Sequence, residues 1–376
     1  MFKHIINHIT KDYSSFLEDT GKNLHITHID DLIIDSDVNE VISILNKIVD
    51  KKIDLTYKID GLPFVAFGQE PQTKKFCIGT KRIATRPAFS LEDIQKIYED
   101  IPELQDILSG LFKILSTKRY NKIFAGDLVW SPRNPKTTEG DSITFKPNTI
   151  KYSVPSDSDL ASNMEGKDFG MIIHTSMTGG PTFKDMNKSN KVELGEIGDT
   201  PNLWLSNAQL NKYSNTETLD LSDFKNEINE LKKYDTSIKD LPFKSADVFS
   251  FFVKANNIKK STEEKLNLFR DFMISKINSK VPTTVEAKTA EINTVFENNK
   301  DKIRNFIILN EKILEVKQKI IEKLTTSMKL KTSHNFEGTF VDNKGEGFVA
   351  VDGDRYVKLV DREEFSAMNS LNWGRK

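Results

Sequence analysis

Apolar residues near the start of the chain recur at the spacing that one face of a helix buries. The segment 37–40 (Asp-Val-Asn-Glu) has the composition of a helix N-terminal cap, and an apolar stripe follows it. The residues of the stripe are Val41, Ile44, Leu45 and Ile48. We therefore predict that residues 1–54 form an N-terminal helical segment.

The pattern changes to short β-rich runs between residue 55 and about residue 181. Two of these runs, 55–68 and 75–80, flank a polar segment at 69–73 that is typical of a hairpin loop. Further strands are predicted at 122–129, 142–145, 150–154 and 169–175, with turns at Pro147-Asn148 and Pro155-Ser156. The helical period of 91–115 predicts a helix between these groups, with a break at Pro102.

A helical block separates these strands from a last set of strands. Residues 182–215 are polar and predict a long loop, and from residue 219 to about residue 330 the helical period returns. Strand-like runs follow at 338–341, 347–351 and 355–360. The predicted fold is α+β, with antiparallel sheets built from 55–181 and 337–376 and a loop and helical insertion at 182–336. The last strands are expected to pack back onto the first sheet.

Composition excludes several classes of protein. The chain has 376 residues, of which 37% are hydrophobic and 29% charged, and its net charge is -1. A nucleic-acid partner would therefore need a local basic groove. The Lys-rich stretches 254–265 and 311–332 are candidates for such a groove, and the alternative is that they are solvated helix faces. Cys77 is the only cysteine, which excludes an internal disulfide and a cysteine-cluster zinc site. No apolar run has membrane-spanning length and no signal peptide is visible, so we expect a cytoplasmic protein without a membrane or disulfide-linked partner.

The segment Lys58-Ile59-Asp60-Gly61 has the residue types that a lysine nucleophile needs. A lysine amine must be neutral to attack the α-phosphorus of a nucleoside triphosphate, so we expect its neighbours to lower its pKa through desolvation or cationic groups. The transferring phosphate needs cationic side chains and Mg²⁺, and carboxylates must hold the metal. Lys58 is predicted to be the nucleophile and Asp60 to position it, while Gly61 allows close backbone approach.

Lys58-Ile59-Asp60-Gly61 resembles motif I of the covalent nucleotidyltransferase superfamily, which comprises polynucleotide ligases and messenger-RNA capping enzymes. The segment 79–82 resembles motif Ia of RNA ligases, whose basic residue contacts phosphate; this resemblance points to Lys81 and Arg82. Gly126-Asp127 is similar to motif III, which places an acid near the ribose. The run 169–175, with His174, falls where motif IIIa would line the purine pocket.

The C-terminal part of the resemblance supplies the metal and the phosphate contacts. Glu346-Gly347-Phe348-Val349-Ala350 resembles motif IV of phage-type RNA ligases, which implies that Glu346 serves the metal, with Asp127 as a second ligand. Lys358 falls twelve positions later, where motif V places a lysine on the α-phosphate, but the usual second lysine is replaced by Val360. Only residues 359–376 follow, which leaves no room for the OB-fold domain of DNA ligases and capping enzymes and favours an RNA-ligase-like enzyme.

The resemblance implies an ATP-dependent RNA or polynucleotide ligase with a nucleotidyltransferase core. It would use ATP, with GTP not excluded, and Mg²⁺ or Mn²⁺, form a lysyl-N-AMP intermediate, and join RNA or DNA ends. Segments 27–32 and 170–175 also resemble an uncharacterised family of tailed-phage proteins, which would place the enzyme in a host cytoplasm.

Several alternatives stay open. Lys58 could be an ordinary strand lysine before an Asp-Gly turn, and Glu346-Gly347 could close a turn. Asp127 could end a strand, Lys81 and Arg82 could protect an edge strand, and His174 could be a satisfied core histidine. The remaining histidines His4, His8, His25 and His28 show no metal-binding spacing. The rival functions are a nucleotidyltransferase for another acceptor and a catalytically inactive phage structural or binding protein with this fold.

Overall fold

The computed structural model describes residues 26–35, 37–148, 150–207, 219–234, 243–255, 260–326, 331–336, 339–342 and 345–361. These residues divide into two compact units. The first, which we call the strand unit, contains Ile26 and the described parts of 55–207 and 331–356; the second, the helical unit, contains those of 27–54, 219–326 and 357–361. His4, His8, His25 and the rest of the predicted N-terminal helical segment before residue 26 lie outside the described residues.

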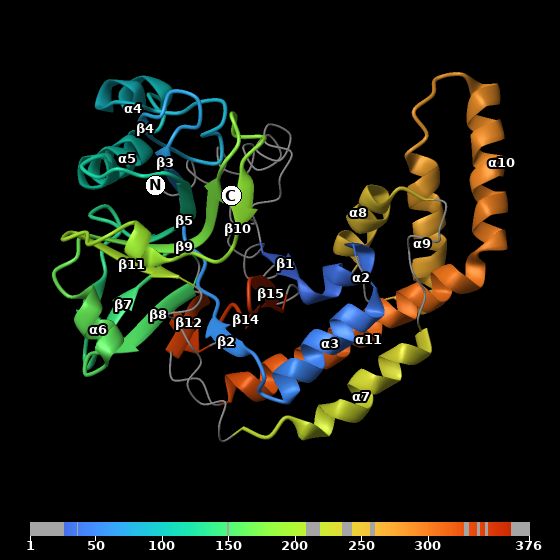
Figure 1. The fold of residues 1–376 in the computed structure, drawn as a ribbon. Helices are drawn as coiled ribbons and strands as arrows, with labels where there is room; N and C mark the ends of the chain where they lie inside the picture. Colours follow the sequence, from blue (N-terminus) through green and yellow to red (C-terminus); the bar gives the residue numbers. More distant parts are fainter. Residues whose placement is uncertain are drawn as a thin grey trace. The chain divides into compact units, whose positions relative to one another are not determined.

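The strand unit is built around a large, mostly antiparallel sheet with the order β10-β9-β5-β3-β4, in which β11 pairs with β9 in parallel (Figure 1). Its strands are β3 (Phe64–Gln69), β4 (Phe76–Gly79), β5 (Ile123–Trp130), β9 (Phe169–Thr178), β10 (Asn187–Ser189) and β11 (Leu203–Asn207). The last two strands, with the short η2 (Leu194–Glu196), lie in the run that we predicted to be a loop. Strand β10 is short and polar and leaves a weak sequence signal, whereas β11 is a short run with two leucines and a tryptophan whose strand character the prediction missed.

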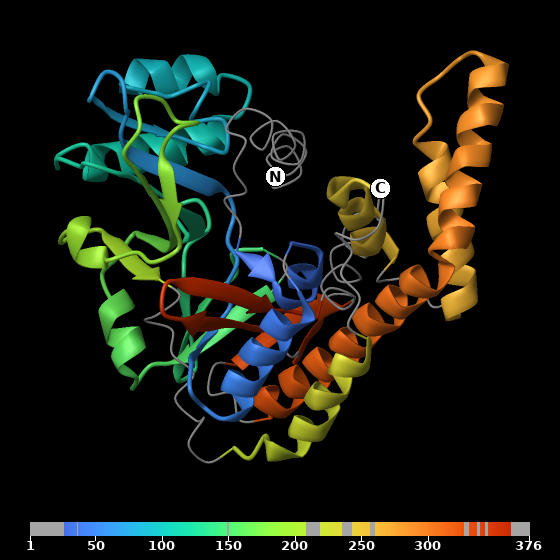
Figure 2. The ribbon, with the colours of Figure 1, turned by 45° about the vertical axis from the view of Figure 1, so that its right-hand side comes forward.

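Helices α4 (Leu91–Ile97) and α5 (Pro102–Leu115) cover one face of this sheet (Figure 2). The predicted break is confirmed, because α4 ends before Pro102 and α5 begins with Pro102 at its first position, where proline is favoured. Leucines of α5 pack against alternate residues of the strands, and together they bury one core. This core includes Leu104, Leu108, Leu111, Val65, Phe67, Phe124, Leu128, Met171 and Ile173. The opposite face of the sheet is left for other residues.

A second antiparallel sheet has the order β13-β12-β8-β7-β6. It consists of β6 (Thr137–Glu139), β7 (Ser142–Phe145), β8 (Ile150–Pro155), β12 (Lys331–Phe336) and β13 (Thr339–Asp342), and α6 (Asp159–Met164) follows β8. Strand β12 comes after the helical block and pairs with β8, with Lys331 opposite Ser153. The expectation that the chain returns to its first strands is confirmed here, although β12 begins within 182–336, the range predicted as insertion.

A third set of strands contains segments from both ends of the described chain. In the strand unit, β2 (Asp54–Tyr57) and β14 (Phe348–Asp352) are neighbours, and β14 leads into β15 (Arg355–Leu359). In the helical unit, β1 (Thr27–His28) pairs in parallel with the end of β15. The prediction that 1–54 is helical is therefore wrong at β1, and the predicted strand 55–68 is interrupted between β2 and β3.

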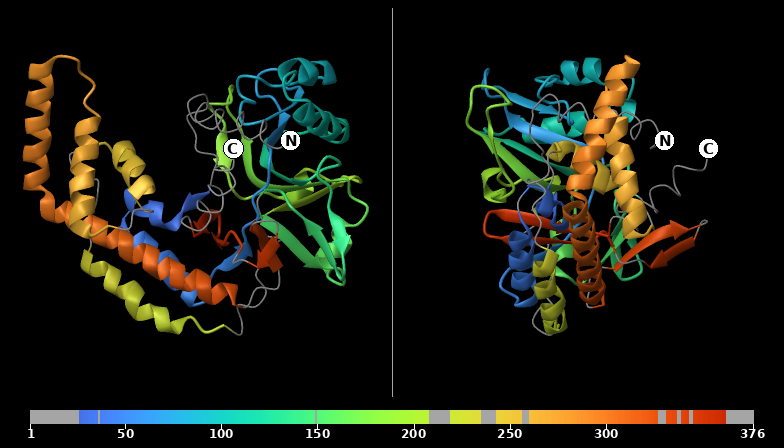
Figure 3. Two further views of the ribbon diagram at one scale, coloured as in Figure 1. Left: turned by 180° about the vertical axis from the view of Figure 1, so that it is seen from behind. Right: turned by 90° about the vertical axis from the view of Figure 1, so that its right-hand side faces the viewer.

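The helical unit is built mainly from helices (Figure 3). They are η1 (Ile29–Asp31), α2 (Leu32–Asp35), α3 (Val38–Val49), η3 (Ser222–Phe224), α7 (Lys225–Glu230), η4 (Leu231–Tyr234), α8 (Ser245–Ala255), α9 (Thr262–Ser275), α10 (Pro282–Asn298) and α11 (Lys300–Thr325). Asp37 caps α3 as predicted, because its side chain accepts a hydrogen bond from Glu40 N at 3.0 Å. In α11 the apolar residues of the predicted period, such as Ile303 and Phe306, are buried.

The α+β fold class is confirmed by this mixture of helices and sheets. Among the described helices none combines the length and apolar character needed to cross a membrane.

Candidate functional site

Lys58 lies in the connection that follows β2, directly beside the start of β14. Its backbone N–H donates to Gly347 O at 3.0 Å, which continues the contact between the two strands beyond the end of β2. Two residues earlier, in β2, the Thr56 hydroxyl donates to Val349 O at 3.3 Å. These contacts place the Lys58 side chain and the residue before Gly347, which is Glu346, at the same position along the strands.

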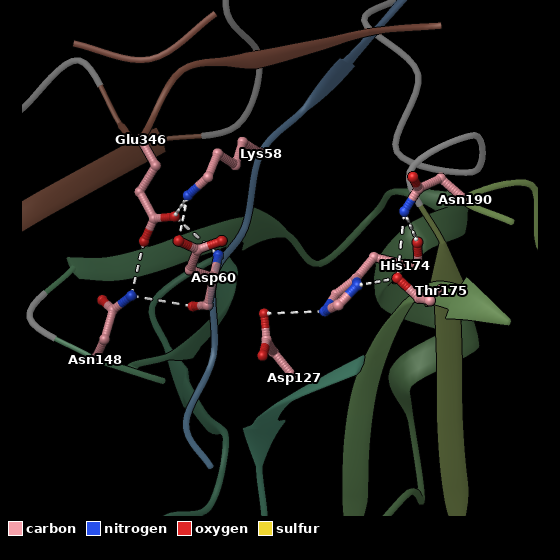
Figure 4. A network of polar contacts seen from close by, with 8 residues as sticks. All are labelled: Lys58, Asp60, Asp127, Asn148, His174, Thr175, Asn190 and Glu346. Carbon is pink, nitrogen blue, oxygen red and sulfur yellow. Dashed lines mark hydrogen bonds and ion pairs between the residues drawn. The ribbon is translucent and has the colours of Figure 1, made fainter. Parts of the chain in front are cut away.

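The Lys58 ammonium is buried between two carboxylates (Figure 4). Lys58 Nζ donates to Glu346 Oε2 at 2.8 Å and forms an ion pair with the Asp60 carboxylate. The backbone N–H of Asp60 donates to the same Glu346 oxygen at 2.9 Å. The side chains of Lys58 and Glu346 are only 6% and 0% exposed, whereas Asp60 is 35% exposed. The structure thus joins three of the predicted site residues in one network.

The charges of this network are unequal, because one ammonium faces two carboxylates. Burial by itself lowers the pKa of Lys58, but the charges of Asp60 and Glu346 outweigh burial and raise that pKa above its ordinary value. Burial raises the pKa of Glu346; the Lys58 ammonium opposes this rise and the Asp60 charge adds to it. The site is therefore short of positive charge when all three groups are ionised.

Asn148, just before β8, and Tyr152 of β8 complete the surroundings of Glu346, and sequence reasoning missed both. Asn148 Nδ2 donates to Glu346 Oε1 at 2.7 Å and to Asp60 O at 3.0 Å. Tyr152 is fully buried; burial, together with the charges of Glu346 and Asp60, raises the pKa of its hydroxyl. In the sequence Asn148 follows a proline and indicates only a turn, so nothing there points to a contact with residue 346.

A second polar group lies on the sheet face opposite α4 and α5, beside a second core that buries Phe64, Ala66 and Ile83. Asp127 of β5 is the cross-strand partner of Phe64 of β3, so both side chains point to this face. His174 of β9 lies beside them: its Nε2 is 3.8 Å from Asp127 Oδ2, and its ring centroid is 5.9 Å from that of Phe64 (Figure 4). The His174 and Asp127 side chains are 14% and 18% exposed, so a ligand could still reach them.

His174 is fixed from its other side by neighbouring residues. Its Nδ1 lies 3.0 Å from the Thr175 hydroxyl, and the Asn190 amide donates to that hydroxyl at 3.2 Å and to His174 O at 2.9 Å. Strand β9 therefore presents an ordered imidazole on the same sheet face as Asp127. The interpretation of His174 as a satisfied core histidine fits its partners, but its partial exposure distinguishes it from a core residue.

Lys81 and Arg82 follow β4 in a turn, so their predicted position on a strand is wrong. Strand β4 ends at Gly79, and the bend is held by Thr80 N, which donates to the Tyr98 hydroxyl at 3.2 Å. Lys81 Nζ lies 5.9 Å from the centre of the Phe64 ring, close enough for a cation–π contact. Lys81 thus belongs to the same face as Asp127 and His174, and Arg82 follows it, half-buried.

Gly61 occupies a position that no larger residue could take without displacing the backbone. A Cβ atom on Gly61 would lie 2.0 Å from Leu128 O. This close approach holds the connection after Lys58 against β5, the strand of Asp127. The glycine therefore ties the two groups of site residues together within the strand unit.

Lys358 belongs to the helical unit, unlike the residues described so far. It lies on β15, is half-buried, and has His28 of β1 as its register partner. Its predicted contact with a nucleotide phosphate stays a prediction.

The residues around Lys58 fit a divalent cation of the magnesium type. Within the described ranges no group of three or more His, Cys, Asp or Glu side chains is arranged for a metal. Mg²⁺ needs fewer protein ligands than that, because it usually keeps several waters and binds one or two carboxylates plus substrate phosphates. The carboxylate that shares the Lys58 ammonium with Glu346 is Asp60, and Asp127, the predicted second ligand, lies 3.8 Å from His174 (Figure 4).

Comparison with known proteins places the chain in a family but gives that family no activity. Residues 23–372 match a family of unknown function, DUF6267, and the chain belongs to this family. No curated protein and no solved structure matches the chain.

Proposed function

We propose that this member of the family is a nucleotidyltransferase that attaches a nucleotide to its own Lys58. The single observation that carries the proposal is the buried Lys58 ammonium held by Asp60 and Glu346, the latter 288 positions away in the sequence. Lysine is almost never fully buried unless it is paired, and here two carboxylates surround one ammonium. An ordinary strand lysine would keep its amine in water.

The arrangement suits an amine that attacks phosphorus. The Lys58 Nζ–P bond would form at the α-phosphorus as the bond to the pyrophosphate oxygen breaks, and the proton of the ammonium would leave before the attack. Asp60 is the partly exposed member of the trio, so it can receive that proton and pass it to water. A Mg²⁺ or Mn²⁺ held by Asp60 and Glu346 would supply positive charge that favours the neutral amine and the departing pyrophosphate.

The sheet face that carries Asp127 and His174 supports the nucleotide-binding part of the proposal. His174 and Asp127 stay partly exposed beside the buried Phe64 ring, and Asp127 can accept a hydrogen bond from a ribose hydroxyl. Lys81 is the cation next to that ring and would contact a phosphate, with Arg82 beside it. We propose ATP as the nucleotide, with GTP as the alternative, and an RNA or DNA end as the acceptor of the AMP.

One observation favours a second candidate, a binding protein that keeps this fold without catalysis. Motif V offers only Lys358, because Val360 stands where the usual second lysine would be. A non-catalytic protein would bind a nucleotide or a nucleic acid without forming a covalent bond. A protein that transfers the nucleotide to another acceptor would still label itself.

Self-labelling tests the proposal directly. Purified protein is incubated with Mg²⁺ or Mn²⁺ and α-³²P-labelled ATP or GTP, beside Lys58→Arg, Lys58→Ala and the control Lys122→Arg. Arginine keeps a positive charge for the two carboxylates but cannot act as the nucleophile, so Lys58→Arg separates charge from chemistry. Lys122 pairs with Glu196 at 2.6 Å elsewhere in the strand unit, so its variant should label like the wild type.

A label on the wild type that both Lys58 variants lose would establish the lysyl-nucleotide and identify the base. Transfer of that label to 5′-phosphorylated RNA or DNA would then identify the acceptor. Labelling that persists in Lys58→Arg would place the nucleotide on another residue. A wild type that takes no label with either nucleotide and either metal would refute the enzymatic proposal.

A further inference from the structure

Asn148 holds the Glu346 carboxylate from the side opposite Lys58 (Figure 4). Its Nδ2 group donates to Glu346 Oε1 and to Asp60 O, at 2.7 Å and 3.0 Å. Its Oδ1 accepts a hydrogen bond from Ile150 N at 2.7 Å, which anchors the side chain to the start of β8. Both donors and the acceptor of the amide are therefore used, and the side chain cannot turn without losing all three contacts.

The two oxygens of Glu346 consequently have different surroundings. Oε2 receives the Lys58 ammonium and the Asp60 backbone N–H, whereas Oε1 receives the neutral Asn148 amide. A neutral donor stabilises the ionised carboxylate without cancelling its charge. A lysine or arginine at this position would cancel that charge. Asn148 thus keeps Glu346 Oε1 fixed, so that Oε2 stays turned to Lys58.

Asn148 also joins three segments that are far apart in the sequence. It connects the turn before β8 to the Asp60 backbone and to Glu346, which is 198 positions away. Because Asp60 O and Glu346 Oε1 share one amide group, a shift of either segment relative to the other strains the same side chain. The spacing between the Lys58 segment and the Glu346 segment is therefore set by a residue of the turn before β8.

We propose that Asn148 is a positioning residue that orients the Glu346 carboxylate toward Lys58 and Asp60. The structural part of this inference concerns the Asn148–Glu346 contact alone. The catalytic part, that labelling of Lys58 depends on this contact, rests on the function proposed above.

The structural part is tested with Asn148→Asp against the matched control Asn134→Asp. Asn134 is also a half-buried asparagine, and its Nδ2 donates to a backbone carbonyl, Lys146 O, at 2.8 Å. Aspartate at 148 would face the Glu346 carboxylate, and two adjacent carboxyl groups share one proton whose pKa is raised in the folded protein. The contribution of a group with a raised folded pKa is present at low pH and is lost as the pH rises through that pKa.

We therefore expect the Tm of Asn148→Asp to fall progressively below that of the wild type between about pH 5 and about pH 8. The Tm difference of Asn134→Asp should change less over this range, because its side chain contacts a backbone carbonyl, Lys146 O, rather than a carboxylate. Equal Tm differences for the two variants at every pH would overturn the inference.

The catalytic part is tested by the rate of self-labelling over the same pH range. The labelling rate of Asn148→Asp, divided by that of the wild type, should fall as the pH rises, by at most about tenfold per pH unit. A residue that mattered only for folding would lower the yield of active protein at every pH and leave this ratio flat. Asn148→Ala adds no charge and should label more slowly than the wild type by the same factor at every pH; labelling at the wild-type rate would count against the inference.

The outcomes separate this inference from the proposed function. If the wild type does not label but the Tm of Asn148→Asp shows the expected pH trend, Asn148 positions Glu346 in a protein with another role. If the wild type labels while both Asn148 variants match Asn134→Asp in rate and Tm, the nucleotidyltransferase stands and Asn148 has no positioning role.

Discussion

Replacing Lys58 with methionine should destabilise the strand unit in a strongly pH-dependent way. The side chain is nearly isosteric, so the cavity term is small and the loss of the ammonium dominates. Glu346 would remain fully buried with Asp60 beside it and without a counter-charge. Removal of one partner from a buried ion pair typically costs about 3–5 kcal/mol, and the partial exposure of Asp60 places this case toward the lower end.

The pH dependence follows from the Glu346 carboxyl. Burial and the Asp60 charge already raise its pKa in the wild type, and the Lys58 ammonium is what opposes that rise. Without Lys58 the folded pKa rises further above the unfolded value of about 4.3, so stability is retained below that value and lost as the pH rises through the folded pKa. The deficit should therefore be small near pH 4 to 5 and reach its full size at about pH 8.

Thermal unfolding followed by near-UV circular dichroism measures this effect in the strand unit. Trp130 and Trp204 stack there with ring centroids 5.0 Å apart and give a signal that depends on native packing. A deficit of about 3 kcal/mol corresponds to a Tm lower by about 6–12 °C at about pH 8. A Tm of Lys58→Met equal to the wild type at about pH 8, or lowered equally at all pH values, would refute the argument that Lys58 neutralises a buried carboxylate.

Three further predictions concern the surroundings of the site. Gly61→Ala should lower the Tm by an amount corresponding to about 1–3 kcal/mol, because its Cβ would lie 2.0 Å from Leu128 O, whereas Gly195→Ala has open space and should cost far less; equal losses in the two would contradict the close approach. Asp127→Asn should raise the nucleotide concentration needed for half-maximal labelling by about tenfold while sparing the maximal rate, as expected for a lost charge-assisted hydrogen bond to a ribose hydroxyl; an unchanged concentration would remove Asp127 from the nucleotide site. Burial raises the pKa of the Cys77 thiol to about 12, so a thiol reagent at pH 8 should modify Cys77 only on unfolding, and rapid labelling of the native protein would contradict its burial.

The sequence predicted best the features that depend on neighbouring positions. The helical period of α11, the cap at Asp37 and the break at Pro102 are local, because each follows from residues within one or two turns. The polar strand β10 escaped prediction, since it is held by pairing with β9 rather than by its own composition, and the short apolar run of β11 was missed within a polar segment. Periodicity states which residues are buried but not which partner buries them.

The candidate site shows the same division. Lys58, Asp60 and Glu346 were found because motifs of fixed spacing contain them, and the structure brings them within hydrogen-bonding distance. Asn148 was missed, because its role depends on a contact across 198 positions that no local pattern encodes. The expectation that Asp127 accompanies Glu346 at a metal stays a prediction. The carboxylate that shares the Lys58 ammonium with Glu346 is Asp60, two positions after the lysine.

The ion pairs that stabilise Lys58 also oppose the chemistry proposed for it. In the arrangement seen here the carboxylates raise the pKa of the amine, so it remains an ammonium and cannot attack phosphorus. A cation that binds Asp60 and Glu346 would remove both the source of this rise and the shortage of positive charge at the site. Nucleophilicity of Lys58 should therefore appear only when metal and nucleotide are bound together, and in their absence the same three side chains act as a structural anchor between the segment after β2 and the start of β14.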